Sequence, residues 1–222
     1  MVIKFPLRKK LQEKGLGLHI NHNSRFKAHS PEWVLFSKIH GRSIRSTFYA
    51  IENRLEELKK LEHGQSITTS KGIVLTKKIN GSYSGNKNML TLKVGIGNSE
   101  FFVKIAPIEH TKHQEQVFHQ VLEYLDSVNH KVDGFNVGVI KPHVFLESKD
   151  HKRVITVTDF YHPDEVVLGV DLSIKEQEKL KPTVSYLSKK LAFRGVSDVG
   201  LHNLFFDKRN NSILLFDLSH VD

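Results

Sequence analysis

Residues 197–217 read SDVGLHNLFFDKRNNSILLFD, and the fold prediction begins from this stretch. Two apolar runs, LFF and ILLF, flank the polar sequence DKRNNS, which predicts two short strands joined by a turn. Asp198 and Asn203 are five residues apart and precede the first strand, whereas Asp217 ends the second. Fourteen residues lead from Asn203 to Asp217, which is enough chain for one hairpin.

Upstream, apolar and polar residues alternate from Gly72 onward, the period expected of half-buried strands. Three antiparallel strands are predicted first, then a helix capped by Thr111, and then two more strands. A further helix is predicted from Ser173, which forms a capping-box pattern with Glu176, and Pro182 is expected to kink or break it. The predicted segments are strands at 73–79, 89–94, 101–105, 137–146 and 154–158, and helices at 111–128 and 173–193.

Residues 1–29 show no clear periodicity, but two helices are predicted directly after them. Ser30-Pro31-Glu32 is a typical helix start, and His40-Gly41 is expected to end the first helix. The second helix is predicted over 42–62, because apolar residues recur there at spacings of three and four and define one buried face. These residues are Ile44, Phe48, Ile51, Leu55, Leu58 and Leu61.

The composition excludes several classes of protein. The 222 residues include no cysteine, which excludes disulfide scaffolds, thiolate zinc sites, iron–sulfur clusters and cysteine nucleophiles. No apolar run approaches the roughly 20 residues of a membrane-spanning helix, and the N-terminus lacks the apolar region of a signal peptide. We therefore expect a soluble, cytoplasmic protein with no membrane partner.

The net charge of +9 is concentrated near the N-terminus, where residues 1–70 hold 13 basic and 6 acidic side chains. Basic segments favour anionic partners, so residues 1–70 are candidates to bind nucleic acid or an acidic protein. A solvated basic surface is the alternative interpretation.

The order of the predicted elements, together with Phe102-Val-Lys-Ile105 and the loop at 197–203, resembles the protein-kinase-like superfamily over residues 72–219. The resemblance implies an α+β fold. The resemblance implies a kinase-like N-lobe with a five-stranded antiparallel sheet and one helix, followed by a rudimentary, truncated C-lobe. Before these two parts, we expect a basic helical N-terminal extension that packs on the truncated body. In chain order, the three parts correspond to residues 1–70, 71–161 and 162–222.

The same resemblance implies a site for ATP and Mg²⁺. Lys104 is similar to the family's lysine that neutralises the α- and β-phosphates of ATP. Asp198 would orient the acceptor hydroxyl, and Asn203 and Asp217 would bind Mg²⁺. Backbone N–H groups of a glycine-bearing loop would cover the triphosphate. The residues in the place of this loop are Gly81, Ser82 and Gly85.

A glutamate from the following helix is expected to pair with Lys104, and two candidates exist. Glu115 falls on the apolar face of the predicted helix, whereas Glu123 falls on the polar face. We assign Glu115 as the partner of Lys104 because of its position on the apolar face. The family's usual spacing between the lysine and the glutamate favours Glu123. The residues that define the apolar face are Phe118, Val121, Leu122 and Leu125.

Several positions depart from the family pattern. Val196 and Ser197 replace the residues usual before the catalytic aspartate, Gly200 follows it by two, and the sequence ends five residues after Asp217. We expect an atypical, minimal ATP- and Mg²⁺-dependent phosphotransferase whose acceptor is not indicated, and the same residues are compatible with nucleotidyl transfer. The alternative is a pseudokinase, a binding module that acts through a protein or nucleic-acid partner.

Overall fold

The computed structural model describes residues 26–28, 31–78, 89–96, 98–108, 113–148 and 152–220. The fold is mixed α+β, and the chain divides into two compact units. Unit 1 comprises Met1–Ile108 and Pro142–Phe160, and unit 2 comprises Glu109–Lys141 and Tyr161–Asp222. The division differs from the three expected segments because the helices before residue 70 share a core with the sheet that follows them.

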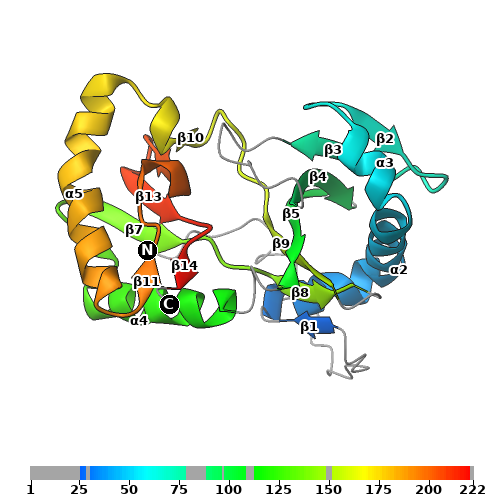
Figure 1. The fold of residues 1–222 in the computed structure, drawn as a ribbon, viewed down its shortest axis with the longest axis horizontal. Coiled ribbons are helices and arrows are strands. Elements are labelled where there is room, and N and C mark those ends of the chain that lie inside the picture. The colour runs from blue at the N-terminus through cyan, green and yellow to red at the C-terminus, as the bar shows by residue number, and fades with distance from the viewer. Residues whose placement is uncertain are drawn as a thin grey trace. The chain divides into compact units, whose positions relative to one another are not determined.

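Unit 1 is built on a seven-stranded sheet in which every neighbouring pair is antiparallel (Figure 1). The expected five strands were too few, because two short strands, β1 and β2, extend the sheet at its two edges. In spatial order the strands are β1 (Phe26–Ala28), β8 (Val144–Glu147), β9 (Arg153–Asp159), β5 (Ser99–Pro107), β4 (Leu90–Ile96), β3 (Val74–Lys78) and β2 (Ser66–Thr68).

One predicted strand, at 137–146, is in fact two strands in different units. Its first part is β7 (Phe135–Val139) of unit 2, and its second part is β8 of unit 1. Pro142 lies between them and has no N–H to donate to a ladder, so the chain leaves one sheet there before entering the other.

Helices α2 (Pro31–Asn53) and α3 (Leu55–Lys60) cover one face of the unit 1 sheet. The predicted apolar stripe forms this contact. Ile44, Phe48, Ile51 and Leu58 are buried, and Leu55 and Leu61 pack against the same core. The chain is non-helical at His40, where φ is −109° and ψ is 16°, and this is the boundary that the sequence predicted.

Lys77 of β3 holds the end of α3 on the sheet. Its Nζ donates to the carbonyl oxygens of Lys59 and Leu61, each at 2.6 Å. The last carbonyls of a helix have no partner within the helix, and a cation there also suits the helix dipole. Within residues 1–70, α2 and α3 therefore contribute to the core of unit 1.

Unit 2 has a five-stranded sheet with α4 (Gln114–Ser127) and α5 (Ile174–Ala192) packed against one face (Figure 1). Strand β13 pairs in parallel with β7 and antiparallel with β12, so the predicted hairpin is present. The strands in order are β10 (Val167–Leu168), β12 (Leu204–Asp207), β13 (Ser212–Leu215), β7 and β6 (Lys131–Val132), and β11 (Val196–Ser197) pairs separately with β14 (Ser219–His220).

Helix α5 begins at the predicted capping box. Ser173 Oγ accepts from the Glu176 amide, and the Ser173 amide donates to the Glu176 carboxylate. Hydrogen bonds from Lys208 of the β12–β13 turn and from Ser173 lower the pKa of Glu176 to about 2. The helix continues through Pro182, because this residue is exposed and water can satisfy the carbonyl that loses its partner. None of the described helices is both long and apolar enough to cross a membrane.

The packing of α2 on the sheet is testable with two matched substitutions in that helix. Ile51 is 1% exposed and Ile39 is 65% exposed. Ile51→Ala should lower the free energy of unfolding by about 2–5 kcal/mol, because it leaves a cavity in the core. Ile39→Ala should change it by less than about 0.5 kcal/mol. Urea denaturation measures both values, and equal effects would show that α2 does not pack in this orientation.

Candidate functional site

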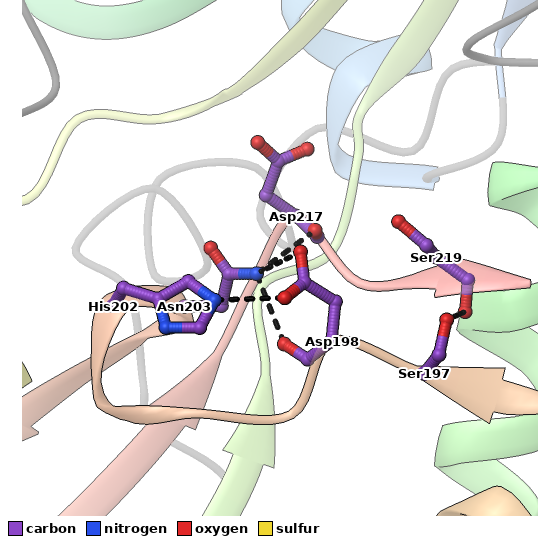
Figure 2. Close-up of polar contacts among 6 residues, drawn as sticks. All are labelled: Ser197, Asp198, His202, Asn203, Asp217 and Ser219. Atoms are coloured by element: carbon purple, nitrogen blue, oxygen red, sulfur yellow. Dashed lines mark hydrogen bonds and ion pairs between the residues drawn. The ribbon is translucent and has the colours of Figure 1, made fainter. Parts of the chain in front are cut away.

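Three polar residues singled out in the sequence converge in unit 2 (Figure 2). Asn203 ends the short 3-10 helix η4 (Leu201–Asn203) directly before β12, and Asp217 follows β13. The Phe216 amide donates to the Asn203 carbonyl at 3.0 Å, which joins the two ends of the hairpin. Asp198 lies at the other end of the loop that carries Asn203, directly after β11.

The side-chain amide of Asn203 holds this loop together. Asn203 is 8% exposed, and its Nδ2 donates to the Asp198 carboxylate at 2.8 Å and to the Asp198 carbonyl at 3.0 Å. It also lies 3.4 Å from the Asp217 carbonyl. The Asp217 carboxylate points away from this amide (Figure 2). One buried amide therefore fixes the backbone on both sides of the site.

Both aspartates have left-handed backbone conformations, with φ of +64° at Asp198 and +51° at Asp217. Aspartate and asparagine tolerate this region better than most residues, but it is still uncommon. Sparsely populated conformations persist where the surroundings impose them, and they cluster at functional sites. Here the Asn203 hydrogen bonds supply that constraint.

His202 provides a second contact to Asp198 that the sequence did not specify. Its Nε2 lies 2.8 Å from Asp198 Oδ1, while Oδ2 accepts from Asn203. Gly200 makes room for the imidazole, because a Cβ at that position would lie 2.6 Å from His202 Cε1. The absence of a side chain at Gly200 therefore leaves space for the His202 ring.

The strand pair β11–β14 fixes the segments next to both aspartates. Ser197 pairs with Ser219 in this ladder, and Ser197 Oγ donates to the Ser219 carbonyl at 3.3 Å. Ser197 directly precedes Asp198, and Ser219 follows Asp217 by two residues, so the ladder sets the separation of the two aspartates.

Three aromatic rings adjoin the polar residues in unit 2. The rings of Phe205 and Phe216 are stacked with centroids 4.6 Å apart, and the Tyr161 centroid is 6.1 Å from that of Phe205. Phe205 follows Asn203 by two residues, and Phe216 directly precedes Asp217. Sequence reasoning missed this cluster. The sequence could have indicated the two phenylalanines, because Phe205 lies on β12 and Phe216 directly follows the paired strand β13. It offered no such signal for Tyr161.

Lys104 lies in unit 1, on the central strand β5. Its cross-strand neighbours are Thr91 of β4 and Thr156 of β9, so these three side chains share one face of the sheet. That face is opposite the one covered by α2 and α3, and Lys104 is half-buried. Thr156 is 7% exposed, and its Oγ has no hydrogen-bond partner among the described residues.

The remaining predicted residues are only partly visible. Gly81, Ser82 and Gly85 lie outside the described residues, and so does the side chain of Glu115, although its backbone is within α4. The Glu123 side chain is 75% exposed, with its carboxylate 4.0 Å from Arg194. The pairing of Lys104 with either glutamate stays a prediction.

The oxygen atoms that the site offers determine which metal ion it could bind. Within the described part of the chain, no group of three or more histidine, aspartate or glutamate residues is arranged to hold a metal ion. Mg²⁺ usually takes one or two carboxylates and completes its shell with water and substrate phosphates. The amide oxygen of Asn203 and the carboxylate of Asp217 fit such a partial donor set.

No family model matches the sequence, and no match was found among curated proteins. Among solved structures, the chain is similar to vaccinia related kinase 3, with 14% identity, a TM-score of 0.40, and coverage of 77% of this chain and 55% of that one. It is also similar to WaaP in complex with acyl carrier protein, with 15% identity, a TM-score of 0.46, and coverage of 89% and 73%. For the bifunctional kinase-methyltransferase WbdD, the identity is 14%, the TM-score 0.36, and the coverage 65% and 33%. The chain thus spans little more than half of the first of these proteins.

The structural role of the Asn203 amide is testable by comparison with its neighbour. Asn203→Ala should lower the free energy of unfolding by about 1.5–3 kcal/mol, because it removes the hydrogen bond from the buried Asn203 amide to the charged Asp198 carboxylate. His202→Ala should cost about 0–1 kcal/mol, since the His202–Asp198 contact is partly exposed. Equal stability of the Asn203 variant and the wild type in urea would rule out the amide as the constraint on the loop.

Proposed function

We propose that this protein is a kinase-like phosphotransferase that uses ATP and Mg²⁺. The observation that carries the proposal is the convergence of Asp198, Asn203 and Asp217 at one end of the β12–β13 hairpin, beside an aromatic cluster. Two oxygen ligands suit Mg²⁺ bound with phosphates, and aromatic rings provide stacking surface for a nucleobase. The order of the elements, from a sheet that carries Lys104 to this hairpin, supports a kinase-like fold.

In the proposed reaction, the acceptor hydroxyl oxygen forms a bond to the γ-phosphorus of ATP. The bond from that phosphorus to the β–γ bridging oxygen breaks, and ADP leaves with the electron pair. Asp198 orients the hydroxyl and accepts its proton. Asn203 and Asp217 would hold Mg²⁺, which would neutralise charge on the phosphate oxygens. Catalysis of this kind rests mainly on positioning, and the Asn203 hydrogen bonds provide it for Asp198.

The remaining roles follow from the family resemblance and belong to the same proposal. Lys104 would bind the α- and β-phosphates, and Glu115 would position Lys104. Gly81, Ser82 and Gly85 would cover the triphosphate with backbone N–H groups. Lys104 belongs to unit 1, and Asp198 belongs to unit 2. We place the reaction in the cytoplasm, with a protein as the expected acceptor or partner.

A pseudokinase is the second candidate, and one observation favours it. Both oxygens of the Asp198 carboxylate accept or share a hydrogen bond within the protein, one with His202 and one with Asn203. A carboxylate held in this way suits a structural role in the loop. The same residues would then bind nucleotide, and the protein would signal through a protein partner without transfer.

Asp217→Asn tests the metal site without the need for an acceptor. The substitution removes one negative charge but keeps an oxygen ligand, and asparagine tolerates the left-handed backbone at this position. Calorimetry measures the affinity for a non-hydrolysable ATP analogue with and without Mg²⁺. The factor by which Mg²⁺ increases this affinity should fall at least about tenfold in the variant, which corresponds to about 1.4 kcal/mol. Asp207→Asn, at the end of β12, is the matched control. An unchanged Mg²⁺ dependence in the Asp217 variant would remove this residue from the metal site.

Asp198→Asn separates transfer from nucleotide binding. Asparagine keeps the left-handed backbone but cannot accept a proton, so the transfer rate should fall by about 100-fold or more while ATP affinity is nearly unchanged. Lys104→Ala should weaken both. Autophosphorylation and transfer to protein, nucleotide and sugar acceptors provide the assay. Full activity of the Asp198 variant would contradict its catalytic role, and ATP binding without transfer in the wild type would favour the pseudokinase.

A further inference from the structure

Helix α2 carries a row of cations on one face. Lys38, Arg42 and Arg45 follow one another at spacings of four and three, which places them along one side of a helix. The sequence from Trp33 to Ile51 contains no acidic residue. The acidic residues of α2, Glu32 and Glu52, lie near its two ends, so no opposite charge stands between the cations of the row.

This face of α2 is directed away from the core. Ile44, Phe48 and Ile51 of the same helix are buried against the sheet, whereas Lys38, Arg42 and Arg45 are exposed. In the described part of the chain, neither Arg42 nor Arg45 has an acidic partner. Among these described residues, no ion pair has to break before either guanidinium group can bind an anion.

A fourth cation joins the row from the β2–β3 turn. Lys71 Nζ donates to Ser46 Oγ at 2.9 Å, and Ser46 directly follows Arg45. The hydrogen bond places an ammonium group beside the arginines. The positive surface is thus built from two segments of unit 1 rather than from one helix alone.

The kink at His40 opens a hollow within the row. Residues 38–43 and Arg45 line a surface hollow of about 350 Å³. Sites for small groups are commonly about 300–1,000 Å³, so this hollow has room for a phosphate group and its water. Its lining is mostly polar and basic, which suits an anion rather than an apolar ligand.

An exposed aromatic ring continues the row. Tyr49 follows Arg45 by four residues and is 62% exposed. Single-stranded nucleic acids are commonly bound by cations along the backbone and by aromatic rings on which bases stack. From Lys38 to Tyr49 the row extends over about 16 Å, which is sufficient for a few nucleotides.

We propose that this surface binds single-stranded nucleic acid. We term it the basic row; it comprises the α2 residues Lys38, Arg42, Arg45 and Tyr49 together with Lys71 of the β2–β3 turn. The arginines bind phosphates through paired N–H donors, and Tyr49 stacks on a base. A membrane surface fits less well, because the apolar face that an interfacial helix would insert is already buried in the core. The proposal does not depend on the phosphotransferase function.

The experiment measures binding of the full chain to a fluorescein-labelled 20-nucleotide RNA by fluorescence anisotropy over a series of salt concentrations. Three phosphate contacts should give a slope of about −2 in log affinity against log salt, at about 0.7 per contact on a single strand. The double variant Arg42→Gln/Arg45→Gln should weaken binding at least tenfold and reduce the slope. Tyr49→Ala should weaken binding about fivefold or more, whereas Tyr49→Phe should keep it.

Two control variants remove equal charge elsewhere. Lys189→Gln/Lys190→Gln changes exposed residues of α5, and Lys9→Gln/Lys10→Gln changes the basic N-terminal stretch. Neither control should weaken RNA binding as much as the arginine variant does. Circular dichroism confirms that each variant is folded. The proposal is overturned if the wild type does not bind the RNA at low salt, if the arginine variant binds as the wild type does, or if either control weakens binding equally. Preference for duplex DNA or for vesicles of anionic lipid over the RNA would also overturn it.

Discussion

The hydrogen bonds of the Asn203 side-chain amide are the interaction on which the rest of the candidate site depends. This buried amide contacts the carboxylate and carbonyl of Asp198 and approaches the carbonyl of Asp217. Both aspartates have left-handed backbone conformations, which non-glycine residues adopt rarely, and the contacts of this amide help to hold them. Asn203 directly precedes β12, so the constraint is adjacent to the sheet of unit 2. The chemistry proposed for Asp198 and Asp217 requires that they be held in this way.

The two units contribute different kinds of support. Lys104 stands on the central strand of an antiparallel sheet whose opposite face is buried by α2 and α3, so its backbone is fixed by ladders on both sides. The aspartates and Asn203 stand on loops, and their positions are fixed by side-chain hydrogen bonds and by the short β11–β14 ladder. Functional side chains placed on loops need such local support, because loops have fewer backbone constraints than strands.

Much of this arrangement was predictable from the sequence, where local patterns were strong. The apolar stripe through Ile44, Ile51 and Leu58 predicted the buried face of α2 and α3. His40-Gly41 predicted the kink. The spacing of Asn203 and Asp217 predicted the hairpin that brings these two residues together. Each prediction rests on neighbours in the chain, so no knowledge of tertiary contacts was needed.

The errors arose where distant segments decide the structure. The apolar stretch 137–146 looks like one strand, but its halves pair with β13 in unit 2 and with β9 in unit 1. The edge strands β1 and β2 are too short to carry a pattern of their own. The contact of His202 with Asp198 depends on the loop conformation, and Tyr161 meets Phe205 only through the fold.

The most direct test of the central claim is an NMR titration that uses Mn²⁺ in place of Mg²⁺, with a non-hydrolysable ATP analogue. Paramagnetic broadening falls off steeply with distance from the metal and so locates it. The account predicts that the Asn203 side-chain amide and the Asp217 backbone amide broaden first, and that they do so only when the nucleotide is present. Broadening of these signals without nucleotide, or of signals elsewhere while these stay sharp, would contradict it.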